Sequence, residues 1–513
     1  MTEQTEKRSF FTKVLDGIER IGNKLPHPFM LFIYLAVFLM VISAVLHAFD
    51  LTVLDPGTNE TVAVRSLLSQ EGFLYILSSM LSNFTGFAPF GLVITMMLGI
   101  GLAQKAGLFE TFMKTTILKA PKSLVTYAVV FAGILGNIAS DAAMIIIPPV
   151  AAMVFHAIGR HPLAGLAAGF ASVGAGFTAN FMIAGTDALL AGISTEAART
   201  IDPDFVVTPI DNWFFMSASV VMLVFLGVWI TEKIIEKRLG TYNPAYADEG
   251  INDQSLDYPT KQEIKALRNA GIALLLYIGA VAMLIVPTNG ILRGEEGTII
   301  PSPFIDNIIP ILLVMFVVVA VAYGITAGTI KSTADVPILM GDAMKDMAGY
   351  IVLVFAAAQF IAYFNWTNIA TLIAVGIADF LQQVEFTGLG LFVVFILLVT
   401  VLNLFITSGS AQWALMAPVF VPLFMLLDYN PAFTQLAYRI GDSATNVITP
   451  MNPYVVMVLG FMKRYDYRAG FGTLMSTMLP YSLIFLGAWI VLFIIWNVVG
   501  LPIGPGSGML LTK

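Results

Sequence analysis

The fold is decided by residues 403–453, NLFITSGSAQWALMAPVFVPLFMLLDYNPAFTQLAYRIGDSATNVITPMNP. Within them, the polar segment 407–410 (TSGS) separates two apolar runs that are each too short to cross a bilayer. A helix is expected to begin at Asn430-Pro431, because Asn suits the cap position and Pro suits the first turn. Polar, irregular backbone at membrane depth is tolerated only where protein shields it or where it lines a wet cavity. The stretch therefore predicts a ligand site near the middle of a membrane.

Composition identifies the class of protein. The chain has 513 residues, of which 58% are hydrophobic and 12% charged, and apolar runs of about 20 residues recur along it. This pattern predicts one polytopic, all-α membrane protein. The chain has no cysteine, which excludes disulfides, thiolate metal sites and a Cys nucleophile, and its four histidines are scattered. We expect no cofactor beyond a coupling ion, and no nucleic-acid partner.

The predicted organisation is two similar halves. We expect a cytoplasmic amphipathic segment (1–28), a first half (29–235), a cytoplasmic loop (236–267) and a second half (268–513). Each half is expected to hold a re-entrant hairpin and then a broken helix: 123–160 and 162–190 in the first half, 387–427 and 431–462 in the second. The other predicted spans are 29–49, 72–103, 212–235, 268–286, 303–325, 349–366 and 474–499. Two amphipathic segments, 330–348 and 368–384, are expected along the membrane faces.

Positive charges support this arrangement. With the N-terminus in the cytoplasm, every Lys and Arg falls in a segment placed inside, except Arg65, Arg199, Arg293, Lys513 and Arg439. The first four are placed outside and Arg439 alone is placed within the membrane. This asymmetry follows the positive-inside rule. It favours about nine transmembrane helices plus two oppositely oriented re-entrant hairpins.

An internal repeat relates the two halves. When the first half is shifted by 269 residues, Asp141 falls on Ser410, Pro149 on Pro418 and His161-Pro162 on Asn430-Pro431. Because the two hairpins are expected to open from opposite sides, this is an inverted repeat. Many secondary transporters have that architecture, with substrate and ion at the repeat interface. Arg439 falls opposite Phe170 and Asp442 opposite Val173, so only the second half is expected to carry an ion pair.

Arg439 and Trp413 are candidates for substrate binding. The Arg439 guanidinium can bind a carboxylate through two parallel hydrogen bonds, whereas its alternative role is a structural ion pair with Asp442, three residues later on the same helix face. Trp413 can stack on an aromatic ring, although a Trp in a membrane protein is more often a packing residue or an interface anchor.

Acidic and amide residues are candidates for ion coupling. Asp141 and Asp187 stand beside Gly-rich breaks at membrane depth, where a carboxylate either couples to an ion or caps free backbone N–H groups. Asn137, Ser140, Asp141 and Asn446, with the carbonyls of 174–180, form a candidate Na⁺ site, since oxygen atoms of unwound helices bind Na⁺ in transporters. Their alternative role is ordinary hydrogen bonding within loops.

The chain resembles the p-aminobenzoyl-glutamate transporter (AbgT) family over essentially its whole length. The resemblance is carried by GIERIGNKLPHPFMLFIYL (17–35), NFTGFAPFG (83–91), SDAAMIIIPP (140–149), GRHPLAGL (159–166), GFTAN (176–180), GTDALLAGISTEAA (185–198), SGSAQW (408–413), PVFVPLFMLL (418–427), RIGDS (439–443) and VGLPIGPG (499–506). It implies a homodimeric carrier of the bacterial inner membrane, with nine spans and two hairpins. Members are described as importers of p-aminobenzoyl-glutamate, a folate breakdown product, or as exporters of sulfonamide-type antimetabolites.

The resemblance also implies which residues function in binding or coupling. The family's functional aspartate of the first half is similar to Asp187. Those of the second half correspond to Ser410, Trp413, Pro431, Arg439, Asp442 and Pro450.

The leading hypothesis is a cation-coupled secondary transporter of small aromatic carboxylates that works by alternating access. Its direction and its coupling ion, H⁺ or Na⁺, stay open. An ion channel is less favoured because channels have filters or charged pore linings rather than broken inverted repeats. An intramembrane protease would use the aspartates as a dyad or Ser410 as a nucleophile, but no histidine is near Ser410 in the sequence. No Walker-type phosphate loop supports ATP-driven transport.

Overall fold

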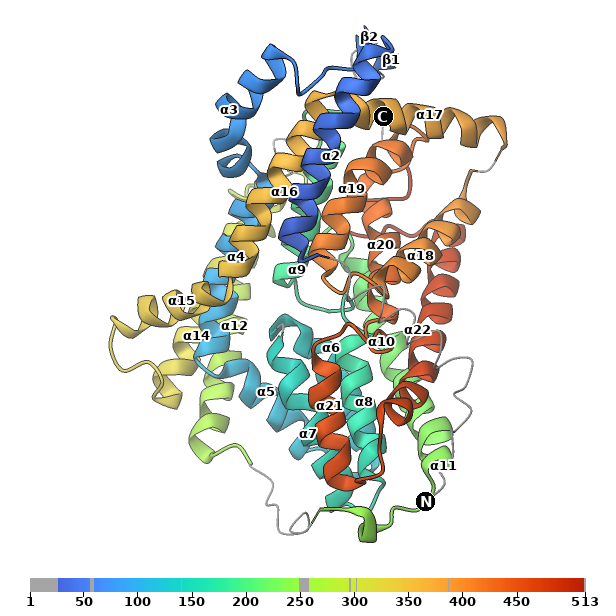
Figure 1. Ribbon diagram of the computed structural model, residues 1–513. Helices are drawn as coiled ribbons and strands as arrows, with labels where there is room; N and C mark the ends of the chain where they lie inside the picture. Colours follow the sequence, from blue (N-terminus) through green and yellow to red (C-terminus); the bar gives the residue numbers. More distant parts are fainter. Residues whose placement is uncertain are drawn as a thin grey trace, which may run out of the picture.

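The computed structural model describes residues 26–55, 60–139, 141–248, 258–294, 297–300, 302–385 and 387–511. Most of the predicted amphipathic segment 1–28 and the centre of the predicted loop 236–267 therefore lie outside the described residues. The described chain is a bundle of helices of very different tilts (Figure 1). It confirms the predicted all-α, multi-span class.

Within the described residues, eight helical stretches are long and apolar enough to cross a membrane. They comprise α2 (Pro28–Ala48), α3 (Gln70–Thr85) with α4 (Ala88–Lys105), residues 122–139, α10 (Trp213–Ile230) with its extension, α12 (Lys261–Ile285), α14 (Ile308–Ala327), α16 (Ala348–Trp366) and α22 (Phe471–Val499). Residues 122–139 are the first arm of the predicted hairpin, and the other stretches coincide with predicted spans. The remaining predicted spans are the two broken helices.

Each hairpin consists of two short helices joined by a short segment that is not α-helical and that contains polar residues, Asn137 in the first hairpin and Thr407 and Ser408 in the second. The first contains α6 (Val125–Gly136), η2 (Asn137–Ala139) and α7 (Asp141–Ala157), and the second contains α18 (Leu389–Asn403) and α19 (Gly409–Met425). The second arm of each hairpin carries two prolines, Pro148 and Pro149 in α7 and Pro418 and Pro422 in α19. That the two hairpins enter the membrane from opposite sides stays a prediction.

Each broken helix consists of two pieces of 12 to 14 residues. They are α8 (Pro162–Gly174) with α9 (Gly185–Ala198), and α20 (Pro431–Ala444) with α21 (Tyr454–Tyr465). The predicted helix start at Asn430-Pro431 is confirmed: the Asn430 side chain accepts a hydrogen bond from the Ala432 N–H at 2.8 Å, and Pro431 is in the first turn. His161 caps α8 in the same way, so the repeat extends to the cap.

The other elements are short or lie at the ends of the bundle. α5 (Leu108–Leu118) connects α4 to the first hairpin, and α15 (Asp335–Asp346) and α17 (Ile369–Gln383) occupy the two predicted amphipathic segments. The strands β1 (Thr52–Asp55) and β2 (Glu60–Ala63) form an antiparallel hairpin that the sequence did not predict, with Thr52 opposite Ala63. The short helices are η1 (Lys122–Leu124), η3 (Thr231–Ile235), α11 (Glu236–Leu239), η4 (Pro244–Tyr246) and α13 (Pro303–Asp306).

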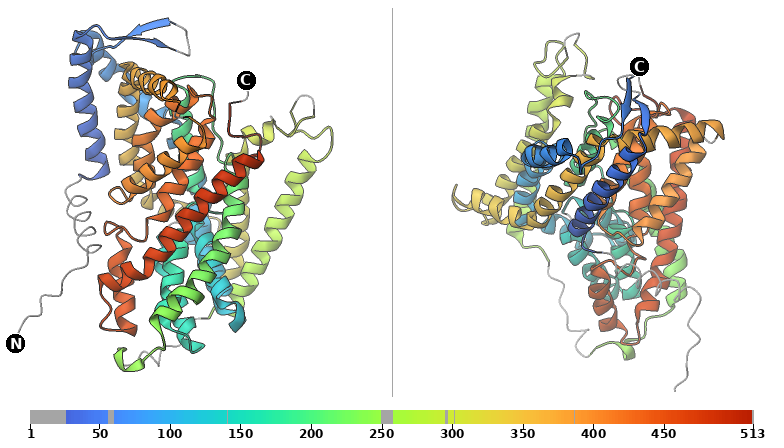
Figure 2. Two further views of the ribbon diagram at one scale, coloured as in Figure 1. Left: turned by 90° about the vertical axis from the view of Figure 1, so that its right-hand side faces the viewer. Right: turned by 45° about the horizontal axis from the view of Figure 1, so that its top comes forward.

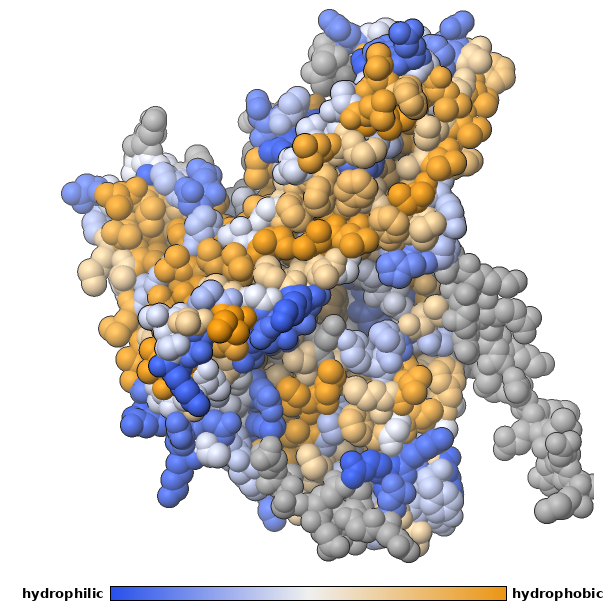
Figure 3. Space-filling model, turned by 60° about the vertical axis from the view of Figure 1, so that its left-hand side comes forward, coloured by the Kyte–Doolittle hydropathy of each residue, from blue (hydrophilic) through white to orange (hydrophobic). Residues whose placement is uncertain are grey.

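Burial distinguishes the centre of the bundle from its periphery. Every residue of α8 and α20 is buried, whereas only Ala266 and Ala270 of α12 are. In the left view of Figure 2, α2 lies at one side of the bundle and α12 at the opposite side. The outer helices expose large apolar side chains, and Figure 3 shows such side chains across much of one face. An apolar exterior of this kind is suited to lipid rather than water.

Small residues bring the central helices into close contact. A Cβ atom added to Gly165 of α8 would lie 2.5 Å from the carbonyl oxygen of Ala151 in α7. A Cβ atom added to Gly441 of α20 would lie 2.7 Å from the carbonyl oxygen of Ile396 in α18. Each broken helix therefore packs backbone to backbone against an arm of its own hairpin, as small residues permit in membrane proteins.

Candidate functional site

The breaks of the two broken helices meet in the middle of the protein. The Thr178 hydroxyl is 2.7 Å from the Ser443 hydroxyl, and the Thr178 carbonyl accepts a hydrogen bond from Arg439 Nη2 at 2.8 Å. Asn446 Nδ2 donates to the Gly174 carbonyl at 3.3 Å. The last two contacts satisfy the backbone carbonyls of Thr178 and Gly174 at the break between α8 and α9, as buried backbone requires. They join the two halves of the repeat directly.

A buried ion pair links the same two halves. Arg439 Nη2 lies 2.6 Å from Asp187 Oδ1, and the two side chains are 1% and 5% exposed. Asp187 Oδ2 accepts hydrogen bonds from the Ala184 N–H at 2.7 Å and from Asn180 Nδ2 at 3.4 Å, at the first turn of α9. Asp187 thus combines the two roles that the sequence left open, as a cap and as an ionic partner.

This geometry corrects two expectations from the sequence. Arg439 pairs with Asp187 rather than with Asp442, and the ion pair belongs to both halves rather than to the second alone. The physical reason is that Arg439 reaches across to α9, while Asp442 faces the 407–410 loop of the second hairpin. In addition, Arg439 Nε has no hydrogen-bond partner among the described residues. One donor of the guanidinium is therefore unused.

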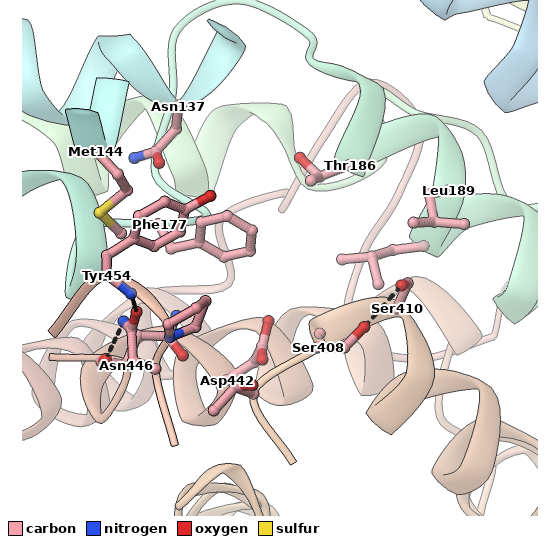
Figure 4. A pocket seen from close by; sticks show the side chains of 15 residues that line it. Asn137, Met144, Phe177, Thr186, Leu189, Ser408, Ser410, Asp442, Asn446 and Tyr454 are labelled. Carbon is pink, nitrogen blue, oxygen red and sulfur yellow. Dashed lines mark hydrogen bonds between the residues drawn. The ribbon is translucent and has the colours of Figure 1, made fainter. Parts of the chain in front are cut away.

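A cavity of about 440 Å³ adjoins this junction, with walls from both halves (Figure 4). The first half contributes Asn137, Met144, Phe177, Thr186, Leu189 and Leu190. The second half contributes Thr407, Ser408, Gly409, Ser410, Asp442, Asn446, Asn452, Pro453 and Tyr454. The volume is in the range of sites for small organic ligands. Asp442 is the one carboxylate among these lining residues.

Asp442 lies tightly against the loop of the second hairpin. A Cβ atom added to Gly409 would lie 2.6 Å from Asp442 Oδ2, so only glycine leaves room for the carboxylate there. Beside it, the Ser408 and Ser410 hydroxyls are 3.2 Å apart, and Figure 4 shows them at the cavity wall next to Asp442. The site thus offers a carboxylate, two hydroxyls and, on the opposite side, the amide of Asn137.

Trp413, Pro431 and Pro450 are not among the residues that line the cavity. The Trp413 ring is fully buried, stacks on Tyr438 with centroids 4.4 Å apart, and donates from Nε1 to Ser194 Oγ at 3.0 Å. The hydrogen bond to Ser194 connects the second hairpin to α9. Pro431 starts α20, and Pro450 is in the turn between α20 and α21. In this conformation Trp413 packs rather than faces a ligand.

The candidate Na⁺ ligands are only partly placed by the structure. Asn137 and Asn446 line the same cavity from opposite halves. Ser140 is outside the described residues, and Asp141 is described only as the first residue of α7. In the described part of the chain, no group of three or more His, Cys, Asp or Glu residues could hold a metal ion. A Na⁺ site built from amide and carbonyl oxygens stays a prediction.

Sequence reasoning missed the aromatic side chains of the cavity, Phe177 and Tyr454. A signal for Phe177 was present, since the 269-residue shift that relates the halves places it on Asn446, and both residues line the cavity. It also missed Asn403, which is fully buried and whose Nδ2 donates to the Asp442 carbonyl at 2.6 Å and contacts Asn446 Oδ1 at 2.9 Å.

Known proteins resemble this chain over nearly its full length. Residues 13–511 match the model of the "AbgT putative transporter family". The p-aminobenzoyl-glutamate transport protein of Escherichia coli (strain K12) is 47% identical over 495 residues, which cover 96% of each chain.

Two solved structures have the same fold. The Alcanivorax borkumensis YdaH transporter is 39% identical, with a TM-score of 0.88 over 94% of this chain and 100% of that one. Neisseria gonorrhoeae MtrF, described within a class of antimetabolite efflux pumps, is 44% identical, with a TM-score of 0.91 over 96% of this chain and 100% of that one. This chain is therefore a multi-pass membrane transporter and belongs to the AbgT family.

Proposed function

We propose that this protein is a cation-coupled secondary transporter of p-aminobenzoyl-glutamate or related aromatic carboxylates, working by alternating access. The relative that is 47% identical is named for p-aminobenzoyl-glutamate transport. The observation that carries the proposal is the cavity of about 440 Å³ shared by the two halves of the repeat, with Asp442 on its wall. Repeat interfaces are where secondary transporters bind substrate and coupling ion.

The lining residues suit a ligand with one aromatic ring and polar ends. Phe177 and Tyr454 provide aromatic surface for the ring, and aromatic pairs gain about 0.5–1.5 kcal/mol beyond area burial. Ser408, Ser410 and Asn137 provide hydrogen bonds to amide and carboxylate groups. We assign ring binding to Phe177 and Tyr454 in this conformation, because the Trp413 ring is already stacked on Tyr438.

Asp442 gives a physical reason for cation coupling. A negatively charged substrate entering a site of low dielectric beside a carboxylate is repelled, unless a proton or a Na⁺ neutralises that carboxylate. Binding of the anion and of the cation then favour one another, which is the requirement for coupled transport. If the cation is Na⁺, the side-chain amide oxygens of Asn137 and Asn446 are its proposed ligands, because both residues line the same cavity.

The Arg439–Asp187 pair is the proposed connection to alternating access. It joins α20 to α9 across the repeat, so relative motion of the halves must stretch or exchange it. Arg439, with its unused Nε donor, can exchange Asp187 for a substrate carboxylate during that motion. Loading of the site would then release the contact that holds the halves together.

A test of the binding site uses the absence of native cysteine. A Ser410→Cys variant should react with a maleimide added to the reconstituted protein, and p-aminobenzoyl-glutamate should slow that reaction several-fold. Ser332→Cys, at an exposed position outside the cavity, is the matched control and should not be protected. Protection equal at both positions, or at neither, would contradict the proposed site.

Export of sulfonamide-type antimetabolites is the second candidate function. It is favoured by the 44% identity to MtrF, which is described within a class of antimetabolite efflux pumps. Sulfonamides share an aromatic amine with p-aminobenzoyl-glutamate, so the same ring site would serve both. A counterflow assay tests this function: proteoliposomes are loaded with labelled p-aminobenzoyl-glutamate, and either a sulfonamide or unlabelled p-aminobenzoyl-glutamate is added outside. Release of the label shows which of the two compounds the protein exchanges.

The proposed setting is the bacterial inner membrane, with the N-terminus in the cytoplasm and two copies per particle. The distribution of Lys and Arg supports the orientation. The dimer rests on the family resemblance, and a mass in detergent of twice 55.5 kDa, after correction for bound detergent, would support it. A monomeric particle that retains transport would contradict it.

A further inference from the structure

A second cavity, separate from the polar one, lies between the α12–α14 pair and the first hairpin. Its volume is about 360 Å³, and α4, α5, α6, η2, α12 and α14 all contribute to its wall. Every lining residue is apolar or glycine, including Phe109, Phe112, Ile138, Leu274 and Phe316. Such a cavity offers no hydrogen bonds to water and accommodates apolar groups instead.

Among the described residues that line this cavity, Gly271 of α12 is the one that is exposed, so we place the mouth of the cavity beside it. Gly271 is exposed, and a Cβ atom added to it would meet no other atom within 4 Å. The next turns of α12 expose Ile272, Leu275 and Leu276 by 50%, 71% and 70%. Exposure of this extent on a helix long and apolar enough to span a membrane indicates contact with hydrocarbon. The mouth of the cavity therefore faces the acyl chains of the bilayer.

Positive charge gathers at the predicted cytoplasmic end of this mouth. Arg268 is one helical turn before Gly271, is exposed, and makes no hydrogen bond or ion pair within the described residues. Lys261 and Lys265 are exposed on the preceding turns, with Glu263 between them. On α5, Lys114 lies 3.0 Å from Glu110. Near the start of the predicted span 268–286, these four basic residues thus outnumber the two acidic residues, Glu110 and Glu263.

We propose that this cavity is a phospholipid site, in which one acyl chain fills the apolar space and the phosphate binds Arg268. The guanidinium is suited to phosphate oxygens, and basic residues at a membrane surface attract anionic lipids. An anionic phospholipid such as phosphatidylglycerol is therefore the favoured occupant. Its acyl chain would extend from the level of Arg268 past Gly271 toward Ile138.

This lipid would lie directly behind the polar cavity. Ile138 of η2 lines the apolar cavity, while the preceding residue, Asn137, lines the polar one. The tip of the first hairpin is thus a thin wall between the two spaces. An acyl chain in the apolar cavity would fill the space behind that wall and limit its movement. The proposal does not depend on which compound the protein transports.

Photolabelling of the full chain in lipid nanodiscs tests the proposal. Phosphatidylglycerol with a diazirine on one acyl chain should label the peptides that contain Ile138 and Phe112. Gly271→Phe fills the mouth and should reduce that labelling several-fold. Gly279→Phe is the matched control: Gly279 is on the same helix with equally open space and does not line the cavity, so labelling should be retained. Gly271→Leu, a smaller change, repeats the test if the Phe variant unfolds.

The headgroup is tested separately with Arg268→Gln. Labelling by phosphatidylglycerol should fall several-fold, and by more than labelling by the phosphatidylcholine analogue, because the choline ammonium offsets the phosphate charge and weakens its attraction to Arg268. Equal effects on both lipids would overturn the assignment of Arg268 to an anionic headgroup. Labelling of Ile138 that persists in Gly271→Phe would overturn the acyl-chain site. A disulfide between two copies of Gly271→Cys in membranes would also overturn it, because a second protein copy would then cover the mouth.

Discussion

The buried Arg439–Asp187 pair predicts a strong energetic coupling between the two halves of the chain. In the Asp187→Asn variant, Arg439 stays charged and fully buried, with the Thr178 carbonyl as its remaining strong acceptor. Breaking a buried pair by removing one partner costs about 3–5 kcal/mol. In the Arg439→Met variant, Asp187 keeps the Ala184 N–H and Asn180 as donors, so we expect a smaller loss. The double variant removes both charges and should be more stable than the sum of the single losses predicts.

A double-mutant cycle measures this coupling. Equilibrium unfolding in mixed micelles, followed by tryptophan fluorescence, gives the free energy of unfolding for the parent and the three variants. We expect a coupling of about 2–3 kcal/mol, near the upper end for contacting residues. The exposed pair Lys345–Asp342, with nitrogen and oxygen 2.6 Å apart, is the control, and its removal should have little effect on the free energy of unfolding. If the losses in free energy of unfolding of the two single variants sum to the loss of the double variant within about 0.5 kcal/mol, the two residues are not coupled and the reasoning is refuted.

Three further predictions concern packing and protonation. Trp413→Phe should retain more transport than Trp413→Ala, because it loses only the hydrogen bond to Ser194 and keeps the stack on Tyr438; uptake assays compare the two. Gly409→Ala should abolish most transport while leaving expression intact, because its Cβ atom would lie 2.6 Å from the Asp442 carboxylate. Burial raises the pKa of Asp211, in the loop before α10, from 3.8 to about 6. The folded state then binds this proton more tightly than the unfolded state, so stability should fall as the pH rises from 3.8 to about 6. Asp211→Asn should flatten that fall in thermal unfolding measured across this range.

Sequence patterns predicted the features that depend on local rules. Apolar runs located the spans, polar interruptions located the breaks of the hairpins and broken helices, and the Asn-Pro pair located the start of α20. These features follow from the cost of placing polar backbone in hydrocarbon and from helix capping, both of which act over a few residues.

The partners within the site could not be predicted because they are distant in the sequence. Spacing along a helix favoured Asp442 as the partner of Arg439, but the actual partner, Asp187, is on the other half of the chain. The repeat alignment indicated that the two breaks correspond, yet it could not show that Trp413 turns toward Tyr438 and Ser194. The apolar cavity behind Ile138 likewise depends on how α5, α12 and α14 pack together.

Uptake of p-aminobenzoyl-glutamate into proteoliposomes, with Na⁺ and H⁺ gradients imposed separately and in both directions, tests the central claim most directly. The account predicts that one gradient drives accumulation by the parent protein. It also predicts that Asp442→Asn abolishes this accumulation while retaining exchange of labelled for unlabelled substrate, because the variant keeps the cavity but no longer takes up the cation. Accumulation by Asp442→Asn as steep as that of the parent, or a parent that responds to neither gradient, would contradict the account.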